Sequence, residues 1–331
     1  MMFEELRNKT VLVTGATGLL GQVIVNRLIE LRAIVVAVIR NAEKAKKAFG
    51  DNDRIKYIVS DITQIDIRKM EIDYIIHAAS ITSSKLFVNS PVDVALTAIE
   101  GTRRTLEIAK LSGIKGYVYL SSMEVYGNPQ TDDKILEDCP SNLDCMKVRS
   151  AYPESKRICE NLCVSFFSQY KVPTKVIRLT QTFGPGIEYD DGRVFAEFAR
   201  CVIEERNIVL HTKGETKRSY LYTEDAVDAI LTVLLDGEHG EAYNAANEET
   251  YCSIYDMAQL VCKVCAKGKI DVEIKIEDTS RMGYAPTLHM NLDTSKLRQL
   301  DWRPTTGLEE MYSKMIKEMK DKHCSSGKKG E

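Results

Sequence analysis

Tyr152 and Lys156 are four residues apart near the start of a predicted helix, so their side chains lie on one face of that helix. The pKa of a tyrosine is about 10 in water, and its phenol cannot act as a base at neutral pH unless the phenolate is stabilised. A neighbouring ammonium group lowers the pKa of such a phenol. The spacing therefore predicts that Tyr152 exchanges a proton with a substrate while Lys156 assists it.

Ser122 and Glu124 add two polar groups to this pair. They follow the apolar run Tyr117–Leu120, which predicts a buried strand, and thus come at the sheet edge where ligands bind in open α/β folds. We expect the Ser122 hydroxyl to hydrogen-bond the reacting oxygen and the Glu124 carboxylate to be available as a base. The alternative for Glu124 is an exposed charge in a loop.

A glycine-rich segment, T-G-A-T-G-L-L-G from Thr14 to Gly21, joins a short β-branched run to an amphipathic one. This order predicts a strand, a turn and a helix whose N-terminus binds a pyrophosphate. Gly15 permits the tight turn, Gly18 lets main-chain N–H groups approach the phosphates, and Gly21 lets the helix pack closely on the strand. The cofactor-binding residues predicted in this segment are Gly15, Thr17, Gly18, Leu19, Leu20 and Gly21.

The turn indicates a dinucleotide, whose oxidised nicotinamide ring would lower the pKa of Tyr152 further. Lys156 is also expected to hold the ribose hydroxyls of this cofactor. NAD-specific enzymes usually end their second strand with Asp or Glu, whereas this chain has Arg40 there and Lys44 one helical turn later. These two cations slightly favour NADP over NAD, although an arginine stacked on adenine is compatible with NAD as well.

Alternating strand and helix patterns predict an α/β fold, a Rossmann-type doubly wound parallel sheet with a smaller, mixed α/β substrate-binding lobe. The predicted strands after the first are Ala33–Ile39, Ile55–Val59, Tyr74–Ile76, Tyr117–Leu120 and Thr174–Leu179, and long helices are predicted at Pro91–Ser112 and Tyr152–Tyr170. We expect residues 1–180 to form the dinucleotide-binding domain, with residues 220–250 returning to it. Residues 181–319 would form the substrate lobe, and residues 320–331 a flexible tail.

Composition excludes several classes of function. The chain has 331 residues, 44% of them hydrophobic, and a net charge of −3 without long basic runs, so nucleic acid is not an expected partner. It contains neither a secretory apolar stretch nor about 18 consecutive apolar residues, which predicts a cytoplasmic protein without membrane contact. The nine cysteines are scattered, which favours reduced thiols. Cys262 and Cys265 lack a second ligand pair, so they are expected to pack as small apolar groups and no metal is expected.

The glycine turn, Ser122, Tyr152 and Lys156, taken together with several further motifs, resemble the extended short-chain dehydrogenase/reductase family. Within that family the chain resembles the nucleotide-sugar epimerases, dehydratases and decarboxylases. Those motifs are Ser60-Asp61-Ile62, His77-Ala78-Ala79-Ser80, R-L-T-Q-T-F-G-P from Arg178, D-G-R-V from Asp191, K-R-S-Y-L-Y-T-E-D-A-V from Lys217 and D-W-R-P-T-T from Asp301. The segment from Arg178 to Val227 looks especially like UDP-glucuronate decarboxylases and their relatives.

The resemblance implies roles for individual residues. Cofactor contacts are implied for Asp61, Ile62, Ala78 and Ala79. Substrate contacts are implied for Ser80, Met123, Gln181, Arg193 and Arg218, with the two arginines near the diphosphate or the sugar, which suits forked guanidinium donors. Otherwise these arginines would be surface residues in solvated loops.

The mechanism implied by the resemblance begins with hydride transfer from the sugar C4 while Tyr152 takes the hydroxyl proton. Met123 stands where the family's dehydratases carry an Asp, and a thioether cannot protonate a departing hydroxyl. Ala98 and Gln181 replace two asparagines common in the family. We therefore expect a nucleotide-sugar epimerase or dehydratase acting through a 4-keto intermediate, with epimerisation slightly ahead of dehydration or decarboxylation.

Two alternative functions remain from the sequence. The first is an NADPH-dependent reductase of a 4-keto nucleotide sugar or another carbonyl compound, which Arg40 and the missing dehydratase acid favour. The second is a non-catalytic dinucleotide-sensing protein. The helices Pro91–Ser112 and Tyr152–Tyr170 resemble the pair that forms a four-helix contact in the family, so we expect a homodimer.

Overall fold

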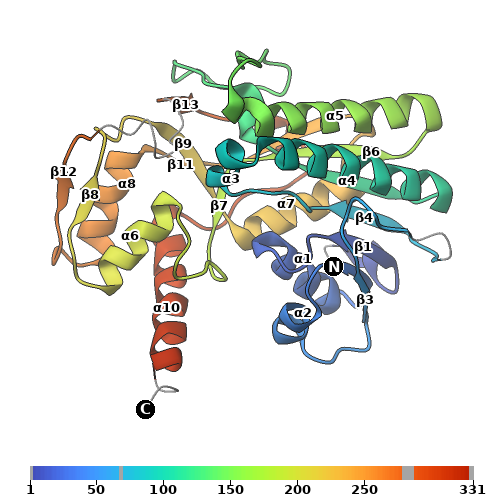
Figure 1. The fold of residues 1–331 in the computed structure, drawn as a ribbon, viewed down its shortest axis with the longest axis horizontal. Coiled ribbons are helices and arrows are strands. Elements are labelled where there is room, and N and C mark those ends of the chain that lie inside the picture. Colours follow the sequence, from blue (N-terminus) through green and yellow to red (C-terminus); the bar gives the residue numbers. More distant parts are fainter. Residues whose placement is uncertain (1–2, 67–69, 278–286, 328–331) are drawn as a thin grey trace.

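A seven-stranded parallel sheet forms the centre of the computed structural model, which describes residues 3–66, 70–277 and 287–327 (Figure 1). The strand order is β10-β6-β5-β4-β1-β2-β3. The strands are β1 (Thr10–Thr14), β2 (Ile34–Ile39), β3 (Ile55–Val59), β4 (Tyr74–His77), β5 (Gly116–Ser122), β6 (Thr174–Leu179) and β10 (Ala242–Ala245). The predicted Rossmann-type sheet is therefore confirmed, with β10 added beside β6.

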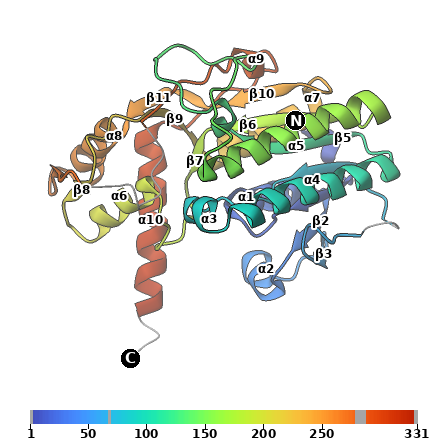
Figure 2. The same ribbon diagram turned by 45° about the horizontal axis from the view of Figure 1, so that its top comes forward.

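Helices cover both faces of this sheet, which explains why its central strands are continuous apolar runs rather than alternating ones. In β1, Val11, Leu12 and Val13 are all fully buried. On one face lie α1 (Leu19–Glu30), α2 (Ala42–Phe49) and α7 (Thr223–Asp236). On the other face lie α4 (Pro91–Ser112) and α5 (Ala151–Tyr170), side by side, with the short α3 (Ser84–Asn89) at one end (Figures 1 and 2).

The second lobe is built around strand β9 (Lys217–Tyr222). β11 (Asn247–Ser253) pairs with β9 antiparallel, whereas β7 (Gln181–Phe183) and β13 (His289–Met290) pair with it parallel. The remaining elements of this lobe are the parallel pair β8 (Ile208–Leu210) and β12 (Val272–Ile274) and the helices α6 (Val194–Ile203), α8 (Ile254–Leu260) and α10 (Leu308–Gly327). α9 (Ser295–Arg298) lies beside β10 of the large sheet.

Aromatic rings fill the core of the second lobe. The Phe183 ring stacks on Phe195 with centroids 4.6 Å apart and meets the edges of Tyr220 and Tyr312. Cys262 is buried in the same core, in a π-helical turn. It packs there as a small apolar group, as the sequence predicts.

The C-terminal segment ties the two lobes together. Trp302 is buried and its indole N–H donates to the main-chain oxygen of Asp225 in α7. The Asp225 carboxylate in turn accepts hydrogen bonds from the Thr305 hydroxyl (2.7 Å) and the Thr306 N–H (3.0 Å). Since α7 packs on the large sheet and β10 is one of its strands, the chain crosses between the lobes more than once.

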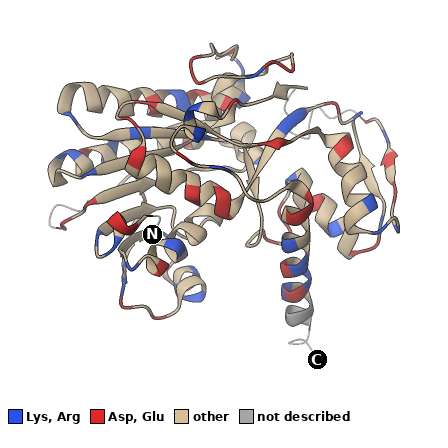
Figure 3. Cartoon of the chain, turned by 180° about the vertical axis from the view of Figure 1, so that it is seen from behind, with Lys and Arg blue, Asp and Glu red and all other residues tan. Residues whose placement is uncertain are grey.

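Residues 320–327 differ from the predicted flexible tail, because α10 continues helical through Gly327. Met319 is buried against the second lobe, and Lys322 and Glu318 form an i,i+4 ion pair, which stabilises the last turns. Figure 3 shows acidic and basic positions alternating along this helix. Residues 328–331 of the predicted tail lie outside the described residues. Within the described ranges, no helix combines the length and the apolar character needed to cross a membrane.

Candidate active site

The turn after β1 requires glycine for steric reasons. Gly15 has a φ of +68°, and a Cβ there would lie 2.9 Å from main-chain atoms of Ala78 and Ala79. A Cβ on Gly21 would overlap the Gly15 main-chain oxygen. Gly18 precedes α1 without any side-chain cap, and the first turn of α1 carries no acidic residue. The main-chain donors at this helix end are thus not neutralised by a local carboxylate, which fits a bound diphosphate.

A buried histidine fixes the two strand ends beside this turn. The Thr14 hydroxyl lies 2.7 Å from Nδ1 of His77 and accepts the N–H groups of Ala78 and Ala79, each at 3.1 Å. Burial, together with the charge of Lys156, lowers the pKa of His77 to about 3, so its imidazole is neutral at pH 7. The strand ends of β1 and β4 are therefore locked together where Ala78 and Ala79 approach Gly15.

The adenosine end of the predicted cofactor site carries both signs of charge. Arg40 is exposed directly after β2, and Asn41 caps α2 by accepting the N–H of Lys44 at 2.9 Å. Hydrogen bonds from Thr63 lower the pKa of Asp61, and the nearby charge of Arg40 lowers it further. Ile62 is buried. The structure thus places Arg40 close to Asp61, a proximity that the sequence did not indicate.

Tyr152 is buried at the start of α5, with its ring stacked on Phe87 of α3. Burial and the charge of Glu124 raise the pKa of Tyr152 well above its ordinary value, whereas a hydrogen bond with Ser122 and the charge of Arg149 lower it. The Ser122 hydroxyl oxygen accepts the N–H of Glu124 at 3.2 Å. Ser122 and Tyr152 therefore lie in contact, but in the protein alone the phenol stays protonated at neutral pH.

Lys156 differs from the prediction in the direction of its side chain. Its ammonium group donates to the main-chain oxygen of Leu120 at 2.7 Å and lies 4.8 Å from the centre of the Tyr119 ring, closer than the 5.8 Å to the Tyr152 ring. Burial lowers the pKa of Lys156 to about 8. The cation whose charge lowers the pKa of Tyr152 is Arg149 instead.

Glu124 forms a two-point ion pair with Arg149, with nitrogen–oxygen distances of 3.0 and 3.3 Å. Both side chains are only about a quarter exposed, at 24% and 25%, so Glu124 is not the solvated loop charge considered as its alternative. Sequence reasoning missed Arg149. The feature that could have indicated it is its position three residues before Tyr152, in a 3-10 turn that leads into α5.

The predicted substrate residues differ in burial and in their hydrogen-bond partners. Met123 is buried and its sulfur accepts a hydrogen bond from Thr180 at 3.4 Å. Nε of Arg218 is buried and has no hydrogen-bond partner among the residues that the structure describes, and its NH1 reaches Gln181 only at 3.5 Å. Arg193, by contrast, is forked onto Asp191, with Nε–Oδ1 at 3.0 Å and NH2–Oδ2 at 2.6 Å. Arg218 therefore has free donor capacity, whereas the charge of Arg193 is already compensated. Ser80 is half-buried after β4.

A second ion pair, which is more deeply buried, fixes α5 against the sheet. Glu160, one helical turn beyond Lys156, accepts from Nε and NH2 of Arg178 on β6 at 3.0 and 2.8 Å. It also accepts from the Ser121 hydroxyl at 2.5 Å. Arg178 reaches on to the Tyr126 hydroxyl at 2.8 Å. These contacts hold α5, β5 and β6 in one register, next to the residues that carry the predicted chemistry.

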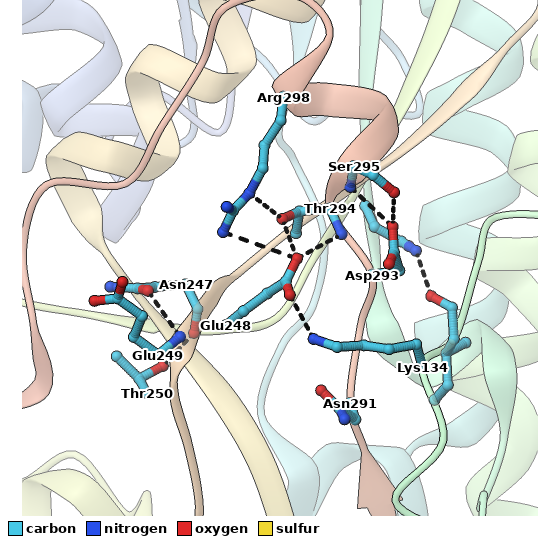
Figure 4. A network of polar contacts seen from close by, with 12 residues as sticks. Lys134, Asn247, Glu248, Glu249, Thr250, Asn291, Asp293, Thr294, Ser295 and Arg298 are labelled. Carbon is cyan, nitrogen blue, oxygen red and sulfur yellow. Dashed lines mark hydrogen bonds and ion pairs between the residues drawn. The ribbon is translucent and has the colours of Figure 1, made fainter.

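The loop of residues 128–146, which follows the Ser122–Glu124 segment, is fastened to the C-terminal part of the chain. Figure 4 shows its main anchor, Glu248, whose carboxylate accepts from Lys134 at 2.5 Å and from the N–H and hydroxyl of Thr294 at 3.0 and 2.5 Å. Asp132 of the same loop accepts from Lys217 at 2.8 Å. The loop therefore links the large sheet to β9 and β11.

The sequence profile of the NAD dependent epimerase/dehydratase family matches residues 11–246 of this chain. That range covers the glycine turn, Ser122, Tyr152, Lys156 and the segment around Arg218. Among curated proteins, UDP-glucuronic acid decarboxylase 6 of Arabidopsis thaliana is 29% identical over 310 residues, which cover 92% of this chain and 86% of that protein.

Two solved structures have closely similar folds. An epimerase from Methanothermobacter thermautotrophicus, Mth375, aligns with a TM-score of 0.82 and 22% identity over 99% of this chain and 97% of its own. UDP-glucuronic acid 4-epimerase of Bacillus cereus, solved with UDP-glucuronic acid and NAD, aligns with a TM-score of 0.80 and 22% identity over 94% of this chain and 99% of its own. At this identity the two structures establish the fold.

Proposed function

Because this chain belongs to the NAD dependent epimerase/dehydratase family, we propose that it is an enzyme that remodels a nucleoside-diphosphate sugar through a transient 4-keto intermediate. One observation carries the proposal. The half-buried Ser122 forms a hydrogen bond with the buried Tyr152 at the carboxyl edge of the sheet that also carries the glycine turn. This is the arrangement needed to bind a sugar hydroxyl and remove its proton next to a dinucleotide.

The cofactor would be held by the turn from Gly15 to Gly21 and by the segments after β2, β3 and β4. When bound, its nicotinamide ring supplies a reversible acceptor for the hydrogen of the sugar carbon. Arg40 follows β2 where an acidic residue would repel a 2′-phosphate, so we place NADP slightly ahead of NAD. Binding constants of the purified protein for both dinucleotides test this preference. Equal or tighter binding of NAD contradicts it.

Two side chains carry the proton chemistry in this proposal. The Ser122 oxygen accepts the Glu124 N–H, and its O–H, which hydrogen-bonds Tyr152 in the protein alone, would donate to the sugar oxygen when the substrate is bound. Tyr152 takes the hydroxyl proton and returns it after the sugar has turned in the site. Epimerisation is placed ahead of 4,6-dehydration because Met123, a buried thioether, cannot protonate a departing hydroxyl.

Arg218 is the proposed anchor for the substrate diphosphate. Its buried Nε has no partner within the described part of the chain, and a planar guanidinium suits paired phosphate oxygens. The Arabidopsis relative and the Bacillus cereus structure both carry UDP-sugars in their names, which supports a nucleoside diphosphate sugar as the substrate class. Arg193 and Gln181 would contribute at the rim of the same site.

Incubation of the purified protein with UDP-, dTDP-, GDP- and CDP-sugars, followed by NMR identification of the products, tests the proposed function. Conversion of a sugar without net use of cofactor supports it. Arg40 and Met123 favour one second candidate, an NADPH-consuming reductase of a 4-keto sugar or another carbonyl compound. Stoichiometric loss of NADPH absorbance identifies that alternative, and binding without turnover across the whole panel refutes both enzymatic functions.

We also propose a homodimer that forms through α4 and α5. The two helices pack against each other and expose several large apolar side chains. These include Leu96, Leu111, Ile158 and Val164. An exposed group of this kind on paired helices is typical of a protein interface. Light scattering at micromolar concentration tests this, and a monomer mass contradicts it.

A further inference from the structure

We propose that Arg149 is a positioning residue for proton transfer: its guanidinium holds Glu124 and supplies the positive charge beside the Tyr152 phenol. This inference deepens the proposed function and rests on Tyr152 being the proton-transferring residue. It assigns to Arg149, a residue in the turn before α5, the electrostatic task that the helical spacing assigns to Lys156.

The contact between Arg149 and Glu124 is a two-point, charge-assisted one. NH1 lies 3.0 Å from Oε2 and NH2 lies 3.3 Å from Oε1. Such forked contacts fix the orientation of both groups as well as their separation. With each side chain only about a quarter exposed (25% and 24%), solvent screens this pair less than it screens a surface ion pair.

The position of Arg149 is itself fixed by its neighbours. The Ser150 hydroxyl donates to the main-chain oxygen of Asp144 at 2.7 Å, and the Asp144 carboxylate accepts the N–H of Met146 at 3.0 Å. On its other side the guanidinium carbon lies 5.8 Å from the centre of the Phe87 ring, within the range of a cation–π contact. Phe87 in turn stacks on Tyr152. Arg149 therefore contacts both Glu124 and the Phe87 ring, which is stacked on the Tyr152 phenol.

The groups that face Tyr152 leave this task to Arg149. Glu124 comes from the turn after β5, Ser122 and the protonated phenol of Tyr119 come from β5 itself, and Lys156 comes from α5. α3 contributes the uncharged Phe87. The ammonium of Lys156 is committed to the oxygen of Leu120.

Without Arg149, the carboxylate of Glu124 would face the Tyr152 phenolate uncompensated. Two like charges in a buried site strongly oppose each other's formation. The phenol would then lose its proton only at a higher pH. Conversely, removal of the Glu124 charge would let the phenol ionise more easily.

The test is a direct titration of the Tyr152 phenol that needs no sugar. The full-length protein, labelled with ζ-13C tyrosine and saturated with the oxidised dinucleotide that it binds more tightly, is followed by NMR from pH 6 to pH 11. Tyr152→Phe identifies the resonance. We expect Arg149→Met to move the titration up by about one pH unit or more and Glu124→Gln to move it down by a similar amount. The double variant should return close to the wild type, because the charges cancel.

Controls separate this role from a loss of structure. Arg157→Met removes an exposed arginine of α5 that pairs with Glu154 at 3.6 Å and should leave the titration unchanged. Arg149→Lys keeps the charge without the forked geometry, so its titration should lie between those of the wild type and Arg149→Met. Each variant is compared by its melting temperature. An unchanged titration in Arg149→Met, or a double variant that titrates as far above the wild type as Arg149→Met does, overturns the assignment, as does a phenol still protonated at pH 11 in Glu124→Gln.

The same variants then report on turnover with a sugar identified by the substrate panel. Arg149→Met should lower kcat about tenfold at pH 7 and move the acid limb of its pH profile upward, while KM changes little. If the panel yields no reaction but the NMR titrations keep their expected order, the proposed function fails and the assignment of Arg149 stands. If a sugar reacts and the order is absent, the assignment fails alone.

Discussion

The ammonium group of Lys156 donates a 2.7 Å hydrogen bond to the main-chain oxygen of Leu120, so this lysine joins α5 to the end of β5. Tyr152 lies one helical turn earlier, stacked on Phe87 with ring centroids 4.1 Å apart and planes inclined by 9°. The lysine therefore fixes the place of the helix on the sheet edge. The orientation of the phenol is set by Phe87 and Ser122.

Tyr152→Phe should reduce turnover by about 100- to 10,000-fold, since it removes the group that exchanges the substrate proton. The fold and dinucleotide affinity should be nearly unchanged, because the ring and its stack on Phe87 remain. Tyr119→Phe is the matched control: its hydroxyl is buried close by but has no hydrogen-bond partner among the described residues. Steady-state kinetics of both variants check this prediction. Equal losses in the two would refute the role of Tyr152.

Gly15→Ala should abolish dinucleotide binding and destabilise the protein. The added methyl would meet main-chain atoms of Ala78 and Ala79 at 2.9 Å, and a φ of +68° strains any residue with a Cβ. Gly113→Ala provides the control, since Gly113 also has a positive φ (+58°) but no atom of the described residues lies within 4 Å of the new Cβ. Calorimetric titration with dinucleotide should detect binding in the control and none in Gly15→Ala. Retained affinity in Gly15→Ala would show that the turn does not hold the cofactor.

The sequence predicts the large sheet well because its determinants are local. The helix Pro91–Ser112 has the predicted bounds, beginning at a proline and ending before Gly113 in a left-handed cap. A buried run rich in β-branched residues marks β6, whose bounds also agree.

Contacts between distant segments and side-chain directions could not be predicted in this way. The hydrogen bond between Thr14 and His77 joins residues 63 positions apart, and the pair of Glu124 and Arg149 joins two short turns. No periodicity connects such positions. The spacing of Tyr152 and Lys156 fixes the helix face that they share, but not the rotamer that turns the lysine toward Leu120.

Arg218→Met should raise the KM for the nucleotide sugar more than Arg193→Met does. Within the described ranges, Nε of Arg218 has no partner and its NH1 makes only a long contact to Gln181, so its charge is available to a diphosphate. Arg193 already neutralises Asp191 through its fork. Loss of a charge-assisted contact costs roughly 1.5–3 kcal/mol, or about 10- to 150-fold in KM. Kinetics with both variants decide the matter, and a larger effect at Arg193 would reverse the proposed order.

Lys175→Met should change stability in a pH-dependent way. Lys175 is buried on β6, where its ammonium group donates to the main-chain oxygen of Leu234 near the end of α7. Burial lowers the pKa of Lys175 to about 8, and the charge of Asp236 opposes this only in part.

The sign of the effect follows from proton binding. Between about pH 8 and pH 10.5 the unfolded chain holds the Lys175 proton while the folded protein has released it, so this residue adds to stability as pH rises through that window. The methionine variant lacks this contribution. Its free energy of unfolding, relative to wild type, should therefore fall by about 2 kcal/mol between pH 7 and pH 10. Urea unfolding at both pH values measures the difference, with the exposed Lys263→Met as the control. If the free energy of unfolding of the variant minus that of the wild type stayed constant or rose between pH 7 and pH 10, the lowered pKa of Lys175 would be contradicted.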